Sequence, residues 1–270
     1  ALSFSSVSSL VIENTSFSNI SGPVLKITNC MKFQINFTTF SQINTRFYSN
    51  NIITINIGEH VYCKGVIIFL NKCRFLSNTY RSGVEINFQI HKTCQAGELV
   101  KNKFHMTVSG SIFYNGKTNY GKSMFYFKRS RSNEPTGPPH MNFLFSSCAF
   151  LWNQGREGSC MSIEHANTIV VEHSISKNNR AFKLGGCMNV AESNNLIINN
   201  SSFTSNRVTN NMYHGQQKLA GGAIYANNIE QVILINDTSF VLNEVSDSIK
   251  HLNAKTVSGG AIYIRRVTQL

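Results

Sequence analysis

Two matched histidine and cysteine pairs are the residues in this chain best suited to metal or redox chemistry. His60 precedes Cys63, and His91 precedes Cys94, with two residues between the members of each pair. Two imidazole nitrogens and two thiolates can bind zinc with tetrahedral geometry. In an oxidising compartment, a disulfide between Cys63 and Cys94 is the simpler account. The spacing therefore leaves three alternatives: this disulfide, a zinc site made by all four side chains, or unpaired thiols.

The other five cysteines have different settings. Cys30 stands, like the two cysteines of the pairs, in a stretch that leads into an apolar run. Cys160 and Cys187 each occupy a small-residue position after glycine, and we expect them to be buried thiols that pack as small apolar side chains. Cys73 and Cys148 hold equivalent positions with one repeat between them, about 9.6 Å apart at the usual strand spacing, which is too far for a disulfide. Because the chain has seven cysteines, at least one is free or bonded outside it.

Carboxylates that could cleave a glycosidic bond are few and dispersed. Of the 13 acidic residues only two are aspartates, Asp237 and Asp247. A glycoside hydrolase needs an acid and a base flanking the bond, and a calcium-dependent lyase needs several oxygen ligands. Glu164 and Glu172 fall in two different predicted strands. We therefore expect no catalytic residues and no cofactor, and a carboxylate pair within about 10 Å in a groove would instead favour a polysaccharide-active enzyme.

An internal repeat determines the elements that must position these residues. An aromatic or aliphatic residue recurs at steps of 23 to 38 residues, at Phe17, Phe40, Phe75, Ile112, Phe150, Ile175, Phe203 and Phe240. Asparagine stands three residues later in six copies: Asn78, Asn115, Asn153, Asn178, Asn206 and Asn243. Short runs rich in Val, Ile and Phe precede most copies and indicate strands.

Such a repeat predicts an all-β solenoid. A unit of three short strands cannot bury its own apolar face, so successive units must stack in register as a parallel β-helix. Eight turns spaced about 4.8 Å apart make a rod of roughly 40 Å. Each aligned position then becomes a column along the rod: phenylalanine stacks inside, asparagine makes a hydrogen-bonded turn ladder, and glycine allows positive φ or close approach of two turns.

The repeat resembles that of a known family of surface proteins. Phe-x-x-Asn followed by Gly-Gly-Ala-Ile is complete at Phe203 with Gly221–Ile224 and at Phe240 with Gly259–Ile262. This pattern is similar to the tandem repeat of the chlamydial polymorphic membrane proteins. It is strong over about residues 66 to 264 and weak before them. The resemblance implies a right-handed parallel β-helix on a cell surface, with an adhesive or structural role and no catalytic residues.

The basic charge of the chain does not match a nucleic-acid module. The net charge is +12, but most lysines and arginines are scattered. The one dense cluster begins at Lys128, in a segment that also holds three of the four prolines, so we expect residues 128–140 to form a protruding basic loop. An acidic partner, such as an anionic glycan or another chain, could contact this loop. The longer steps of the repeat predict two further extruded loops, at 207–219 and 244–258.

Six Asn-x-Ser/Thr sequons are candidates for glycosylation in a secreted protein. They begin at Asn14, Asn19, Asn36, Asn199, Asn200 and Asn236. Their number is what the abundance of asparagine, serine and threonine gives by chance, so only their location is informative. Asn19 and Asn36 are the better candidates, and Asn14, Asn199 and Asn236 follow apolar strands, where a side chain could point outward.

These observations predict a single β-helix segment, 1–270, of a longer protein. No stretch of 18 apolar residues occurs. We expect an extracellular or cell-surface location and a non-enzymatic structural or adhesion role. The expected partners are other surface or matrix proteins, glycans and neighbouring turns of the same chain, and nucleic acid is not among them. Besides the enzyme, the open alternative is a subunit of an extracellular filament or assembly, which large exposed apolar patches on one flank would favour.

Overall fold

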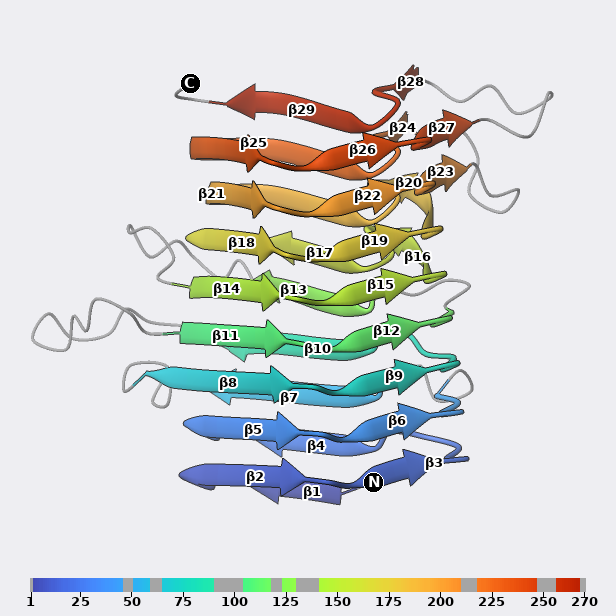
Figure 1. The fold of residues 1–270 in the computed structure, drawn as a ribbon. Coiled ribbons are helices and arrows are strands. Elements are labelled where there is room, and N and C mark those ends of the chain that lie inside the picture. Colours follow the sequence, from blue (N-terminus) through green and yellow to red (C-terminus); the bar gives the residue numbers. More distant parts are fainter. Residues whose placement is uncertain are drawn as a thin grey trace, which may run out of the picture.

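The computed structural model describes residues 2–45, 51–58, 65–89, 104–117, 123–129, 141–209, 218–246 and 256–267, and in these residues the chain is all-β. Consecutive turns pair through parallel strands. In Figure 1 the front strands run from left to right and the distant strands run back, while the chain climbs from the N-terminus to the C-terminus. The coil is therefore a right-handed parallel β-helix, as the repeat predicts.

Three faces surround the interior (Figure 1). The first face contains β2 Ser9–Glu13, β5 Lys32–Asn36, β8 Val66–Asn71, β11 Phe104–Ser109, β14 Met141–Ser146 and β18 Thr168–Glu172. The second face contains β3 Ser16–Ser18, β6 Thr39–Ser41, β9 Arg74–Leu76, β12 Ile112–Tyr114, β15 Ala149–Leu151, β19 Ile175–Lys177, β22 Ser202–Thr204 and β26 Ser239–Val241. The third face contains β1 Leu2–Ser5, β4 Leu25–Thr28, β7 Ile53–Gly58, β10 Val84–Gln89, β13 Phe125–Arg129, β17 Met161–Glu164 and β29 Ile262–Val267.

Two long strands join the first and third faces. β21 Met188–Asn199 and β25 Ile224–Asn236 begin in the third face and end in the first, so the two faces form one 15-stranded sheet. The second face is a separate sheet of eight strands. A short sheet covers the passage from the second face to the third and contains β16 Gln154–Glu157, β20 Arg180–Leu184, β23 Arg207–Thr209, β24 Lys218–Ala220, β27 Glu244–Ser246 and β28 Thr256–Ser258.

The interior is filled by side chains at alternate positions of each strand. Strands β8, β11 and β14 have buried residues at every second position, as expected for strands with one face on a core. Phenylalanine rings stack along the axis at this interior, with ring centroids 4.7 Å apart for Phe40 and Phe75 and 5.0 Å apart for Phe75 and Phe113. The predicted aromatic column is therefore confirmed.

The pairing of the strands shows that the sequence prediction misplaced two members of that column by one residue. Phe113, and not Ile112, pairs with Phe75 and Phe150. In the next turn Ser176 pairs with Phe150, while Ile175 points outward. Both errors have one cause: a strand has alternating sides, so the aliphatic neighbour of an inward residue faces solvent.

The asparagine ladder shifts by one residue in the same two turns. Its buried members are Asn78, Asn153, Asn179 and Asn206, with the partly buried Asn243 at the C-terminal end. Gly116 holds the ladder position of the fourth turn, where Asn115 was predicted. Asn178 likewise lies one residue before the ladder. Asn115 and Asn178 instead occupy a corner with φ of 51° and 57°.

Each ladder asparagine bridges two neighbouring turns. Asn179 Nδ2 donates to the carbonyl oxygen of Phe150 at 2.8 Å, and Asn179 Oδ1 accepts from the backbone N–H of Asn153 at 2.9 Å. Asn206 repeats the pattern, accepting from the N–H of Asn179 and donating to the carbonyl oxygen of Ser176. The side-chain amides thereby satisfy backbone groups that the corner removes from the sheets.

The glycine pairs serve both predicted purposes. Gly185 and Gly221 have φ of +55° and +68°, a region that side chains disfavour. Gly186 and Gly222 follow them, and a Cβ on Gly222 would overlap the carbonyl oxygen of Gly260 in the next turn. Glycine at these positions therefore lets successive turns approach closely.

Two of the three predicted loops have strands at their described ends. Segment 207–219 begins with β23 and ends in β24, and segment 244–258 begins with β27 and ends with β28. The positions between these strands lie outside the described residues. In segment 128–140 only Lys128 and Arg129 are described, as the end of β13, so the predicted Pro-rich loop is untested.

Candidate functional site

The predicted metal or disulfide group is not covered by the structure. His60, Cys63, His91 and Cys94 all lie outside the described residues. The disulfide and the zinc site therefore stay predictions. Within the described ranges, no three His, Cys, Asp or Glu side chains come close enough together to hold a metal ion. In the same ranges no helix is long and apolar enough to cross a membrane.

The five described cysteines are buried, and none of them forms a disulfide within the described residues. Burial raises the pKa of Cys73 to about 11 and that of Cys148 to about 12. Burial also raises the pKa of Cys160, and the neighbouring thiol of Cys187 raises it further. A nucleophilic cysteine needs a lowered pKa, so Cys73, Cys148 and Cys160 act as small interior side chains. Cys187 is buried beside Cys160, and the predicted burial of these two thiols is confirmed.

Cys73 and Cys148 belong to a polar column at the corner after the first face. Each member donates its hydroxyl or thiol proton to the backbone carbonyl two residues earlier: Thr15, Thr38, Cys73, Ser111, Cys148, Ser174, Ser201 and Thr238. The intervening turn contributes Ser111, whose hydroxyl accepts from the backbone N–H of Cys73 at 3.0 Å. Ser111 stands two residues before Phe113, as Cys73 stands two residues before Phe75, so this column follows the same register as the aromatic column.

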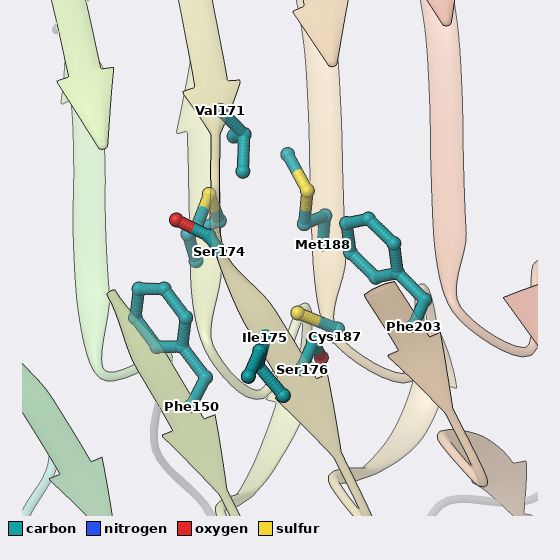
Figure 2. Close-up of a pocket in the computed structure, with 9 residues that line it drawn as sticks. Phe150, Val171, Ser174, Ile175, Ser176, Cys187, Met188 and Phe203 are labelled. Carbon is teal, nitrogen blue, oxygen red and sulfur yellow. The ribbon is translucent and has the colours of Figure 1, made fainter. Parts of the chain in front are cut away.

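A small internal gap marks the interruption of the aromatic column. Figure 2 shows Cys187, Met188 and Phe203 around it, with Phe150 on the other side of Ser176. The Ser176 hydroxyl hydrogen-bonds to Asn206 Oδ1 at 3.0 Å and to Asn179 Nδ2 at 3.0 Å. The serine therefore belongs to the asparagine ladder, and the gap is a packing feature among apolar groups.

The carboxylates named as catalytic candidates lie on different faces of the fold. Glu164 lies in β17 of the third face and Glu172 in β18 of the first. Asp237 stands at a left-handed corner with φ 45°, and Asp247 lies outside the described residues. On the third face, Glu85 accepts a hydrogen bond from Asn51, and Glu85 pairs in register with Tyr126. Burial, then Glu164, Glu85 and Glu157, raise the pKa of Tyr126, so its phenol stays protonated.

The sequon asparagines differ in access. Asn14, Asn19 and Asn236 are exposed, the first two with φ of 48° and 54°, and Asn199 is half-buried. Asn36 is only 5% exposed, and its Nδ2 donates to Glu13 Oε1 at 2.6 Å. A glycan on Asn36 would have to break this hydrogen bond, so the structure favours Asn19 of the two better candidates.

The outer side of the second face and the corner that follows it carry exposed apolar side chains, next to the half-buried Leu151 and the exposed Lys177. We name Tyr114, Leu151, Trp152, Ile175 and Lys177 the aromatic patch. Trp152 is 56% exposed, Ile175 52% and Tyr114 42%. Tyr114, Leu151 and Lys177 are register partners on three adjacent strands, β12, β15 and β19. The patch therefore lies on consecutive turns, about 4.8 Å apart.

Trp152 stands where most turns have a polar residue. Its corner column contains Asn19, Gln42, Ser77, Asn115, Trp152, Asn178, Ser205 and Leu242, with φ between 51° and 60°. The N–H of Trp152 donates to the carbonyl oxygen of Lys177 at 3.0 Å, which places the tryptophan between Asn115 and Asn178. A bulky side chain with positive φ is an uncommon arrangement, and such strain gathers at functional sites.

A row of polar and basic residues borders the patch. We name Lys117, Gln154, Arg180 and Arg207 the flanking row, in which each residue pairs in register with the next. Arg180 Nε donates to Thr209 Oγ1 at 2.7 Å. Partial burial, and then the charge of Arg207, lower the pKa of Arg180. Two cations thus face each other on adjacent turns of a surface that could accept an anion.

Sequence reasoning missed this site. The aromatic patch contains Ile175, which the alignment had placed inside, and Trp152, which the alignment had passed over. One signal was available: the residue before a ladder asparagine is polar at Ser77, Asn178 and Ser205, whereas it is tryptophan before Asn153 and leucine before Asn243. A hydrophobic residue in a solvent-facing turn column indicates a contact surface.

Comparison of the chain with protein-family models, with curated proteins and with solved structures finds no match. The resemblance to the polymorphic membrane proteins therefore stays a prediction.

Proposed function

We propose that this chain is a non-enzymatic structural and adhesion segment of an extracellular or cell-surface protein, and that the aromatic patch is its contact site. The exposed Trp152 carries this proposal. Its indole contributes nothing to the interior columns, although it occupies a corner where asparagine or serine would cost less strain. Exposed apolar groups gathered on one side of a rigid sheet are typical of interaction surfaces.

The architecture supports a structural role for the rest of the chain. Backbone hydrogen bonds join successive turns, and stacked phenylalanines and ladder asparagines strengthen the junctions where they occur. The patch therefore sits on a preorganised support, which lowers the ordering cost of binding.

Adhesion of coated beads tests the proposal. Beads carrying the chain should adhere to cells or matrix layers, and Trp152→Ala should abolish most of that adhesion. Phe37→Ala is the matched control, because Phe37 is also an exposed aromatic residue at a left-handed corner, with φ 49°, but lies beside Lys72 at another corner. Equal adhesion of the Trp152→Ala and unsubstituted beads would refute the contact site.

A second candidate function, a subunit of an extracellular filament, is favoured by an apolar row on the outer side of the first face. Leu144, Val170, Ile197 and Leu234 are consecutive register partners there. Pairing of two copies through this row would bury it. Sedimentation at increasing concentration tests this function: Val170→Asn should reduce self-association, whereas Trp152→Ala should leave it unchanged.

A further inference from the structure

We propose that the aromatic patch and the flanking row together bind an anionic polysaccharide, with sugar rings on Trp152 and Tyr114 and acidic groups on the neighbouring cations. This inference rests on the proposed adhesion function and names the ligand class of the same site.

The aromatic part of the site suits a pyranose ring. The faces of tryptophan and tyrosine rings are electron-rich, and the C–H bonds of a sugar ring carry partial positive charge, so the two surfaces stack. Tyr114 and Trp152 lie on adjacent turns, and Leu151 stands between them as the register partner of Tyr114. Tyr114, Leu151 and Lys177 form one column along the rod, with Trp152 beside it, and a linear chain of sugars could follow this column.

The polar part of the site supplies hydrogen bonds and positive charge. Asn115 and Asn178 flank Trp152 in the corner column, and Gln154 lies two residues further along the chain. Side-chain amides can donate to and accept from sugar hydroxyls. Lys117, Arg180 and Arg207 lie in the same register row as Gln154, and Lys177 is the register partner of Leu151. In the described strands of the second face no residue is acidic.

The positive charges beside the aromatic patch favour an anionic ligand over a neutral one. Arg180 and Arg207 are register partners whose like charges disfavour each other, and a bound sulfate or carboxylate would relieve that repulsion. Two carboxylates lie near these arginines: Glu157, which ends β16 and is paired with Lys183 at 2.7 Å, and Glu244, which is the register partner of Arg207 on the following turn. The four cations of the aromatic patch and the flanking row outnumber Glu244. The site therefore presents net positive charge to an approaching ligand.

The composition of the patch favours a glycan over a protein partner. The cores of protein interfaces are depleted in lysine, whereas Lys177 lies two residues from Ile175 within the same strand of the patch. The apolar side chains are also interleaved with amides, so each ring is bordered by hydrogen-bonding groups. This mixture fits a ligand whose own surface alternates C–H and hydroxyl groups.

The fluorescence of Trp152 gives a direct test, because it is the one tryptophan of the chain. The chain 1–270 is titrated with heparin, polygalacturonate, neutral dextran and oligothymidylate at low salt and again at about tenfold higher salt. Heparin, polygalacturonate or both should shift the emission saturably, with affinity that falls at high salt, and dextran should not. Binding of heparin alone would identify sulfate as the recognised group, and binding of polygalacturonate would identify carboxylate.

Calorimetric titration of variants with the same polysaccharide localises the site. Trp152→Ala should weaken binding about tenfold or more, and Lys177→Gln about three- to fivefold. Lys26→Gln is the matched control, because it removes one exposed positive charge from β4 on the third face and should change affinity less than about twofold.

Four results would overturn the inference. Equal losses in Lys177→Gln and Lys26→Gln would indicate diffuse charge attraction, and equal binding of dextran would remove the role of charge. Tighter binding of oligothymidylate would identify nucleic acid as the preferred ligand. Absence of polysaccharide binding, with bead adhesion still dependent on Trp152, would mean that the adhesion function holds through a protein partner. If bead adhesion also survives Trp152→Ala, both proposals fail.

Discussion

Replacement of Asn179 by alanine should destabilise the rod strongly, because this side chain completes hydrogen bonds of buried backbone groups in the neighbouring turn. The substitution leaves the N–H of Asn153 without its acceptor and the carbonyl of Phe150 without the amide donor. Both residues are buried. Each buried group that loses its partner costs about 1 to 3 kcal/mol, so the expected loss is about 2 to 6 kcal/mol.

The neighbouring residue provides the control. Asn178 has φ 57° and a half-buried side chain outside the ladder, and glycine adopts this backbone conformation without strain. Asn178→Gly should therefore change the free energy of unfolding by less than about 1 kcal/mol.

Urea unfolding monitored by Trp152 fluorescence measures both variants, because Trp152 directly precedes Asn153. With a slope of about 3 kcal/mol per molar urea, a loss of about 4 kcal/mol lowers the midpoint by about 1.3 M. Solenoids can unfold in parts, so the comparison requires equal slopes in all three proteins. An Asn178→Gly midpoint as low as that of Asn179→Ala would refute the ladder register.

Two further predictions concern other columns. Burial raises the pKa of Cys73 to about 11 and that of Cys148 to about 12, above the ordinary value of 9.0. Their protonated thiols therefore stabilise the fold below pH 9, and this stabilisation is lost as pH rises from 9 towards 12. The double variant Cys73→Ser and Cys148→Ser should show a smaller drop in urea midpoint between about pH 8 and about pH 10.5, and an unchanged drop would contradict the assignment. In the glycine column, Gly222→Ala should cost about 3 kcal/mol or more in thermal unfolding, because its Cβ would overlap the Gly260 carbonyl oxygen. Gly260→Ala is the control, since its nearest atom is 3.8 Å away, and similar losses in both variants would count against a close approach of turns.

The repeat predicted the architecture because periodic spacing constrains a solenoid more tightly than any local preference does. It failed by one residue where two signals conflicted. At Ile175 and Ser176, an aliphatic residue is adjacent to a polar one, and the interior position belongs to the serine because Asn179 and Asn206 satisfy its hydroxyl. That partner set exists only after two turns have stacked, so hydropathy within one turn cannot reveal it.

The candidate site was less predictable than the fold. Exposure of Trp152 follows from a corner conformation, and the neighbours Tyr114 and Lys177 are brought to it from the adjacent turns. To predict from the sequence which residues of adjacent turns become neighbours, one needs the alignment of the repeats, and that alignment had placed Ile112 and Ile175 inside. The same one-residue shift therefore concealed both the inward serine and the outward patch.

Parallel pairing of successive turns also determines how the rod would respond to mechanical tension. The backbone hydrogen bonds point along the long axis, and the junctions between turns are connected in series (Figure 1). In the shortest repeat of the central turns, equivalent positions such as Asn153 and Asn179 are 26 residues apart. One released turn would lengthen from about 4.8 Å to roughly 90 Å of extended chain. Pulled along its axis, the molecule would therefore lengthen in discrete steps, each of which dissipates the energy of one junction while the remaining turns stay folded.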